Sequence, residues 1–273
     1  MSLNSELFNL ILGDNVSVLE TFDSDSIDLV VTSPPYDNLR NYSNTLKWNF
    51  NSFKLLSKEL YRVIRPHGII VWIVNDATIK GSETGTSFKQ ALYFKEIGFN
   101  LHDTMIYKKQ NPIPQIFRNR YNNEFEYMFI FSKDSVTTCN PIKIPCKHAG
   151  LKLNGTTYKN YSANDNNDRV KLASDVKDFK IKGNVWEYVV GKLKIDQGGK
   201  FHPATFPYQL AYDHIISWSN VGDTVLDPFM GSGTVGLACN DLNRKFIGIE
   251  LVESYFNQAE KRIDNYVNKK GGL

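Results

Sequence analysis

The sequence predicts an α/β fold built on a mostly parallel sheet. Two features predict it: short apolar runs alternate with helical patterns in the N-terminal third, and the C-terminal third repeats this alternation around a glycine-rich turn. With 273 residues, 41% of them hydrophobic and 22% charged, the chain is long enough to bury a core in one large domain that carries an insertion.

The N-terminal third has the β–α–β order of a parallel sheet. Apolar residues recur at helical spacing over Phe50–Ile64, and the turn from Arg65 to Gly68 introduces the strand that follows. A second helix is expected over Phe88–Ile97. The expected strands are Phe8–Leu12, Ile27–Val31, Ile69–Val74, Leu101–Tyr107 and Phe125–Phe131.

The pattern weakens after Lys133 and returns at Phe206. Residues 154–178 are rich in Asn, Asp, Lys and Ser and have little periodicity, so this region is interpreted as an insertion of loops and a few short strands. Beyond it, helices are expected over Pro207–Trp218, Thr234–Leu242 and Glu253–Val267, and strands over Thr224–Leu226 and Phe246–Ile249.

A glycine-rich turn near the C-terminus predicts a ligand that contains a nucleoside. Asp227-Pro228-Phe229-Met230-Gly231-Ser232-Gly233-Thr234 follows one strand and opens a helix, and Glu250 ends the next strand. Glycine permits a tight turn that a ligand can approach closely, and the acid can accept both ribose hydroxyls. Only thirty-seven residues follow Gly236, so the sheet has to be completed from the N-terminal third. This late position disfavours a nicotinamide enzyme.

A second motif lies at the carboxyl end of the apolar strand Ile27–Val31, where open α/β sheets bind ligands. It reads Thr32-Ser33-Pro34-Pro35-Tyr36. The prolines fix the backbone and remove two N–H donors, which leaves a rigid array of acceptors. The Ser33 hydroxyl and the Pro34 carbonyl are suited to accept protons from an exocyclic base amine and so direct its lone pair, while Tyr36 offers a face for an extruded base.

Together these motifs resemble the amino-methyltransferases of DNA, which act on cytosine N4 or adenine N6. Their order, with the Ser-Pro-Pro-Tyr tip first and the glycine-rich turn last, is similar to the permuted beta class. Three further segments match: Gly13-Asp14, Lys200 to Pro207, which includes His202 and Pro203, and Arg244 to Glu250.

The resemblance implies a Rossmann-like fold dependent on S-adenosylmethionine, with a mostly parallel twisted sheet, an antiparallel edge strand and permuted motif order. It implies a catalytic part at 1–132, an inserted target recognition region at 133–200 and a cofactor-binding part at 201–273. The implied catalytic residues are Ser33, Pro34, Pro35 and Tyr36. The implied cofactor-binding residues are Asp14, Thr32, Ser33, His202, Pro203, Asp227, Pro228, Phe229, Gly231, Ser232, Gly233, Thr234 and Glu250. No metal is implied.

Ser as the first residue of the tip favours cytosine N4 over adenine N6, as the resemblance implies. Other functions stay open: methylation of RNA or of a protein amide, and a catalytically inactive DNA-binding relative. Methylation of cytosine C5 is disfavoured. It requires a thiolate nucleophile, and the candidate Cys146 lies in the weakly patterned insertion. That reaction would also give the Ser-Pro-Pro-Tyr tip no role.

Charge and composition indicate partners and location. The net charge is +3, yet residues 133–200 hold thirteen Lys and Arg against seven Asp and Glu. This basic excess suits a polyanion, such as the double-stranded DNA that the resemblance implies, and is equally common on a solvated Lys-rich surface. We expect DNA to be gripped by this region and by the loops Asp37–Trp48 and Gln110–Asn123, with Arg118, Arg120 and Tyr121 as candidates. A homodimer and a cognate restriction endonuclease are further partners to expect. The polar N-terminus and the absence of long apolar runs predict a cytoplasmic protein without membrane contact.

Overall fold

The computed structural model describes residues 7–35, 48–112, 119–147, 149, 157–159, 169–171, 177–189 and 207–270. The chain divides into two compact units. Unit 1 comprises Met1–Asn140 and Asn184–Leu273, and unit 2 comprises Pro141–Gly183. Among the described helices, none has the length and apolar character to cross a membrane.

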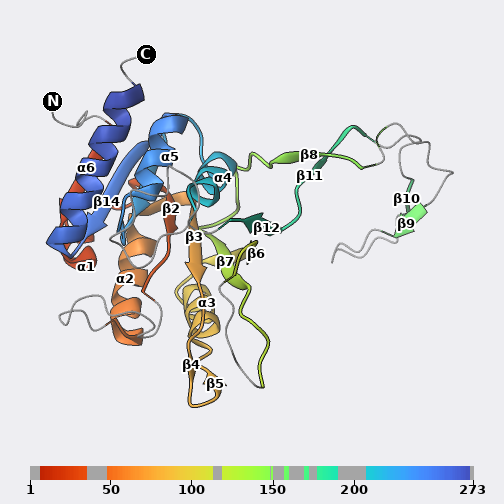
Figure 1. Cartoon of the computed structure of the whole chain (residues 1–273), viewed down its shortest axis with the longest axis horizontal. Coiled ribbons are helices and arrows are strands. Elements are labelled where there is room, and N and C mark those ends of the chain that lie inside the picture. Colours follow the sequence, from red (N-terminus) through yellow and green to blue (C-terminus); the bar gives the residue numbers. More distant parts are fainter. Residues whose placement is uncertain are drawn as a thin grey trace. The chain divides into compact units, whose positions relative to one another are not determined.

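Unit 1 is built on a mostly parallel sheet in which the described residues form eight strands (Figure 1). The expected fold class is therefore confirmed. The strands, in spatial order, are β1 (Phe8–Leu12), β14 (Lys245–Glu250), β13 (Thr224–Asp227), β2 (Ile27–Thr32), β3 (Ile64–Val74), β7 (Phe125–Ser132), β6 (Asn100–Lys109) and β12 (Val185–Tyr188).

The antiparallel strand was expected at the edge of the sheet, but it lies inside the sheet. β7 runs antiparallel to both β3 and β6, and all other neighbours are parallel. The chain leaves β3, forms β6 one position further out and returns through β7 into the gap. β12 then pairs with β6 and becomes the outer strand, although it falls in the segment 133–200 that the sequence assigns to the insertion.

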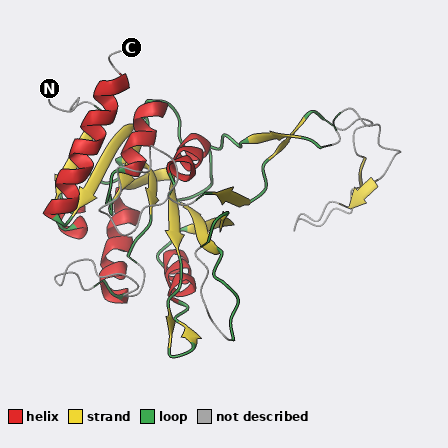
Figure 2. Ribbon diagram, viewed as in Figure 1, coloured by secondary structure: helices red, strands yellow, loops and turns green. Residues whose placement is uncertain are grey.

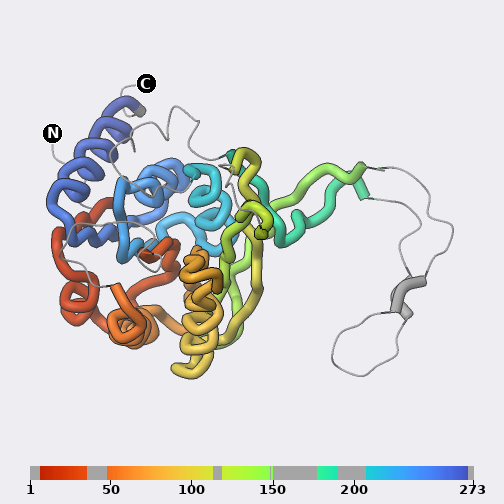
Figure 3. The backbone as a smooth tube through the Cα atoms, turned by 60° about the horizontal axis from the view of Figure 1, so that its bottom comes forward, coloured from red at the N-terminus to blue at the C-terminus, as the bar shows by residue number. Residues whose placement is uncertain are grey.

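Helices cover the sheet in two groups (Figures 1 and 3). Helices of each group contact one another. The first group is α1 (Asn15–Leu19), α2 (Phe50–Val63) and α3 (Thr86–Glu96), and the second is α4 (Tyr208–Trp218), α5 (Thr234–Leu242) and α6 (Glu253–Lys270). α2 begins where the side chain of Asn49 accepts hydrogen bonds from the N–H groups of Asn51 and Ser52.

An aromatic cluster fills the core between the sheet and the first group of helices. Phe53, Trp72, Phe94 and Phe131 are fully buried. The ring centroids of Phe53 and Phe94 are 5.1 Å apart, and those of Trp72 and Phe94 are 5.2 Å apart. The indole N–H of Trp72 donates to Oε1 of Gln90, so the polar atom of this buried ring has a partner. This packing holds α2 and α3 against β3 and β7.

Four short elements and one turn depart from the sequence-based expectation (Figure 2). Helix α1, strand β12 and the hairpin formed by β4 (Thr78–Ile79) and β5 (Ser82–Glu83) were not expected. The expected turn from Arg65 to Gly68 lies within β3 as an irregularity: Ile27 pairs with Ile64 but Leu29 pairs with Ile69, and His67 has a φ of 66°.

Unit 2 contains two antiparallel pairs among its described residues. β8 (Lys143–Pro145) pairs with β11 (Phe179–Ile181), and β9 (Thr157–Lys159) pairs with β10 (Arg169–Lys171). Phe179 and Ile181 are exposed.

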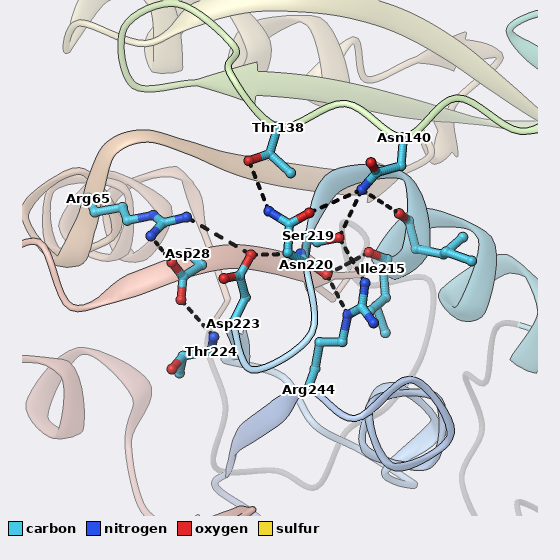
Figure 4. Close-up of polar contacts among 11 residues, drawn as sticks. Asp28, Arg65, Thr138, Asn140, Ile215, Ser219, Asn220, Asp223, Thr224 and Arg244 are labelled. Atoms are coloured by element: carbon cyan, nitrogen blue, oxygen red, sulfur yellow. Dashed lines mark hydrogen bonds and ion pairs between the residues drawn. The ribbon is translucent and has the colours of Figure 1, made fainter.

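A polar network joins the amino ends of β2 and β13 (Figure 4). Asp28 pairs with Arg65 at 2.5 Å and accepts a hydrogen bond of 2.6 Å from the N–H of Thr224. Burial nevertheless raises the pKa of Asp28. At the same end, the side-chain amide of Asn140 donates to the carbonyls of Ile216 and Ser219. These contacts stabilise the end of the sheet opposite the candidate site.

Candidate functional site

The two motifs meet at the carboxyl edge of the sheet. Val225 and Leu226 of β13 pair in parallel with Leu29 and Val30 of β2. β13 pairs in turn with β14. Because parallel strands end at the same edge, the tip that begins at Ser33 and the turn that begins at Pro228 start from neighbouring strands. The sequence predicted that the tip and the turn lie at one edge of a single sheet, and the pairing of β13 with β2 confirms this prediction.

A buried hydrogen bond links the two strand ends directly. The hydroxyl of Thr32, which has no exposed surface, donates to Oδ1 of Asp227 at 2.7 Å. The same oxygen accepts from the N–H of Phe229 at 3.1 Å. Burial raises the pKa of Asp227 to about 7, and these two donors oppose that rise. The carboxyl group thus orders the start of the glycine-rich turn.

Glu250, at the end of β14, holds the far side of this turn. Its Oε2 accepts from the N–H of Gly231 at 2.9 Å and its Oε1 accepts from the N–H of Val252 at 2.9 Å. The residue is 9% exposed, and burial raises its pKa while the backbone donors lower it. A carboxylate has about four acceptor positions, so acceptor capacity remains beyond these backbone donors.

The backbone of the turn requires glycine and is braced from α6. Gly231 and Gly233 have φ values of 52° and 76°, and a Cβ on Gly233 would lie 2.9 Å from Cδ1 of Ile263. The Nη1 group of Arg262 donates to the carbonyl of Ser232 at 2.8 Å and to the hydroxyl of Thr234 at 3.1 Å. Helix α6 therefore fixes the position of the turn.

Aromatic rings lie beside the turn and near the Ser-Pro-Pro tip. The centroid of Phe229 is 5.0 Å from that of Trp48 and 6.4 Å from that of Trp72. In the tip itself, Pro34 is buried whereas Ser33 and Pro35 retain exposed surface. The turn therefore packs against aromatic side chains, next to Trp72, whose strand partner Thr32 precedes the tip.

A family model described as DNA methylase, for N6 and N4 methyltransferases, matches residues 27–261, a range that includes both motifs and the strands that join them. The chain belongs to this DNA methylase family.

Individual relatives agree with this assignment. The methylase is 47% identical over 247 residues to the orphan methyltransferase M.BamHII of Bacillus amyloliquefaciens. The aligned residues cover 89% of this chain and 90% of that protein. It is 30% identical over 267 residues to the type II methyltransferase M.HpaI of Haemophilus parainfluenzae, covering 95% and 75%. The methylase is therefore a DNA methyltransferase whose cofactor is S-adenosylmethionine.

Two solved structures share the fold. The cytosine-N4-specific PvuII DNA methyltransferase has a TM-score of 0.68 and 20% identity, with 96% of this chain and 92% of that chain covered. The complex of M1.HpyAVI with S-adenosylmethionine has a TM-score of 0.61 and 23% identity, with 94% and 100% covered.

Most of the expected site residues of the methylase lie at this one edge. They are Thr32, Ser33, Pro34, Pro35, Asp227, Pro228, Phe229, Gly231, Ser232, Gly233, Thr234 and Glu250. Asp14 follows β1 and caps α1, where its Oδ1 accepts from the N–H of Ser17 at 3.0 Å. Tyr36, His202, Pro203 and Arg118 lie outside the described residues.

Several residues of the methylase that shape the site carry no sequence signal. Arg262 contacts the turn from a helix 30 residues further along the chain. The side-chain amide of Asn15 donates to the carbonyl of Pro228 at 3.2 Å, which ties α1 to the turn. No local pattern marks either residue, because both act through contacts between distant segments.

Proposed function

We propose that this methylase transfers a methyl group from S-adenosylmethionine to the exocyclic N4 amine of cytosine in double-stranded DNA. The single observation that carries the proposal is the hydrogen bond between Thr32 and Asp227, since it joins the Ser-Pro-Pro tip to the glycine-rich turn. A methyl donor at the turn and a base at the tip would then share one site.

The residues at the turn fit the cofactor. Glu250 retains acceptor capacity beyond its bonds to Gly231 and Val252, which suits two ribose hydroxyls. The turn from Asp227 to Thr234 would enclose the methionine moiety, and its N–H groups at the start of α5 suit a carboxylate. Asp14 would contact the adenine, and His202 with Pro203 would lie beside the methionine end, as the family motifs suggest.

The tip would activate the amine by position and hydrogen bonding. An exocyclic amine is a poor nucleophile because its lone pair is conjugated with the ring. The Ser33 hydroxyl and the Pro34 carbonyl would accept the two amine hydrogens, favour a pyramidal nitrogen and direct its lone pair. When bound, S-adenosylmethionine supplies an electrophilic methyl group. The amine nitrogen would form the new N–C bond as the S–C bond breaks, S-adenosylhomocysteine would leave as the neutral thioether, and the amine would release one proton to water.

Cytosine is proposed as the target base on two grounds. The tip begins with Ser33, the version that the family resemblance associates with cytosine N4. The PvuII enzyme, which has the same fold, is described as specific for cytosine N4. Adenine N6 is the alternative within the same mechanism.

Recognition of the DNA sequence is proposed for residues 133–200. Unit 2 falls within this range, and the range carries the basic excess of the chain. The target base would leave the stack to reach the tip, with Tyr36 as its stacking surface. M.BamHII is described as an orphan methyltransferase, so the proposal assigns this chain no nuclease partner.

Nucleoside analysis tests the proposal. Unmethylated plasmid DNA is incubated with the purified protein and S-adenosylmethionine, digested to nucleosides and analysed by mass and retention. We expect N4-methylcytosine, and a Ser33→Ala variant serves as the control for contaminating activity. N6-methyladenine would reassign the base, and 5-methylcytosine or an absence of methylated nucleosides would refute the proposed reaction.

A further inference from the structure

The β4–β5 hairpin extends beyond the carboxyl edge at which the Ser-Pro-Pro tip lies. Thr32, the last residue of β2, pairs with Trp72, and β3 continues to Val74 before the hairpin begins. At about 3.3 Å per residue, Asn75 lies about 10 Å beyond Trp72 along the strand. Figure 1 shows β4 and β5 past the end of β3.

The hairpin is held on its α3 side by a buried carboxylate. Oδ1 of Asp76 accepts from the N–H of Ser87 at 2.9 Å and from the hydroxyl of Thr84 at 3.2 Å, and Oδ2 accepts from the hydroxyl of Ser87. Asp76 is only 9% exposed. The base of the hairpin is therefore fixed to the start of α3.

Arg120 holds the hairpin on its other side. Its guanidinium donates to the carbonyl of Gly81 and lies 3.7 Å from Oε1 of Glu83. Nearby, the side-chain amide of Asn75 donates to the carbonyl of Phe125 at 3.2 Å. The chain between β6 and β7 thus braces the hairpin, and the exposed charge of Glu83 has a cationic partner.

The tip of the hairpin presents an apolar residue and a cation. Lys80 and Gly81 form a two-residue turn with φ values of 49° and 81°, the backbone of a tight hairpin. Ile79 is 51% exposed, and Lys80 is exposed beside it. Tyr121, which follows the bracing Arg120, is fully exposed.

We propose that the β4–β5 hairpin is a DNA-contacting wedge, in which Ile79 packs into a groove beside the target base while Lys80 contacts phosphate. The inference rests on the proposed function: a duplex whose base reaches Ser33 has to lie across the carboxyl edge and meet the element that extends beyond it. Rigid apolar side chains that enter a groove unstack neighbouring bases, which favours extrusion of the target base.

Val221 provides a matched control for Ile79. It is 72% exposed on the turn between α4 and β13, at the opposite edge of the sheet, and it is also β-branched. The photoreactive residue p-benzoylphenylalanine is introduced at position 79 or 221, and each protein is irradiated with unmethylated duplex DNA and S-adenosylhomocysteine. Position 79 should crosslink to DNA at least about fivefold more than position 221, because only the wedge contacts the duplex.

Kinetics of Ile79→Ser and Val221→Ser give the second measurement. Ile79→Ser should lower kcat/KM for DNA by about tenfold, the effect of one lost base contact, with unchanged affinity for S-adenosylmethionine. Val221→Ser should match the wild type. Equal crosslinking at both positions, together with a wild-type kcat/KM for Ile79→Ser, would overturn the proposal that the hairpin contacts DNA. The proposed function would stand in that case, because the wild type would still methylate DNA. Crosslinking is read without turnover, so it tests the wedge even if the wild type proves inactive.

Discussion

The hydroxyl of Thr32 donates a hydrogen bond of 2.7 Å to Oδ1 of Asp227, a residue 195 positions later in the chain. Both groups are buried, and each stands at the end of a parallel strand. The bond therefore couples the segment proposed to hold the base to the segment proposed to hold the cofactor.

Replacement of Thr32 by Val should destabilise the protein by about 1–3 kcal/mol, because a buried carboxyl group loses a donor. Asp227→Ala removes the acceptor of this hydrogen bond. A double-mutant cycle of the two changes, measured by urea unfolding, should give a non-zero coupling energy. Additive effects would mean that the Thr32–Asp227 bond contributes nothing to stability.

Stability should depend on pH through Asp227. Burial raises its pKa from 3.8 to about 7, so the unfolded chain loses this proton at lower pH than the folded chain does. The contribution of Asp227 to the free energy of unfolding is fully present below about pH 4. It falls by up to about 1.4 kcal/mol per pH unit as the pH rises to about 7. The difference in unfolding free energy between the wild type and Asp227→Asn should change over this window. Parallel curves for the two proteins would contradict the raised pKa.

Arg262→Ala should weaken the binding of S-adenosylmethionine. The side chain donates to Ser232 and Thr234 in the turn, so its loss frees the turn to adopt other conformations. We expect a dissociation constant about tenfold higher by calorimetry, the effect of about 1.4 kcal/mol, with kcat at saturating cofactor within about twofold. Lys261→Ala, an exposed neighbour on α6, is the control. Equal changes in the dissociation constant of both variants would show that Arg262 has no specific role in cofactor binding.

Glu250→Ala should reduce cofactor affinity by about 1–3 kcal/mol through lost hydrogen bonds to the carboxylate. The turn should also loosen, because Gly231 loses the acceptor of its N–H. Glu250→Gln retains one neutral acceptor oxygen and should lie between the wild type and Glu250→Ala. Binding is measured by calorimetry with the protein alone. Wild-type affinity in Glu250→Ala would contradict the ribose assignment.

The sequence predicted the meeting of the two motifs because both follow apolar strands and each has a local signature. Periodicity also identified β2, β13 and β14 with their helices, and α5 was predicted at its observed bounds, Thr234–Leu242. A strand-to-turn boundary marked by glycine or proline is a local property of the chain, so one sequence suffices to find it.

Features that depend on distant contacts were missed. The hairpin of β4 and β5 has two-residue strands, too short for periodicity to register. β12 contains only Val185 to Tyr188 and becomes a strand by pairing with β6. Thr32 was expected at the cofactor, but no sequence pattern could indicate that its hydroxyl donates to Asp227.

The most direct test of the division of roles between the two segments is a comparison of chemistry and cofactor affinity in Ser33→Ala. Single-turnover methylation of DNA and equilibrium binding of S-adenosylmethionine are measured on the same preparation. The rate should fall by about 100-fold or more, because an acceptor for the amine is lost, while cofactor affinity stays within about threefold of the wild type. A Ser33→Ala variant that loses cofactor affinity but retains the wild-type rate at saturating S-adenosylmethionine would contradict the assignment of Ser33 to the methyl-transfer step.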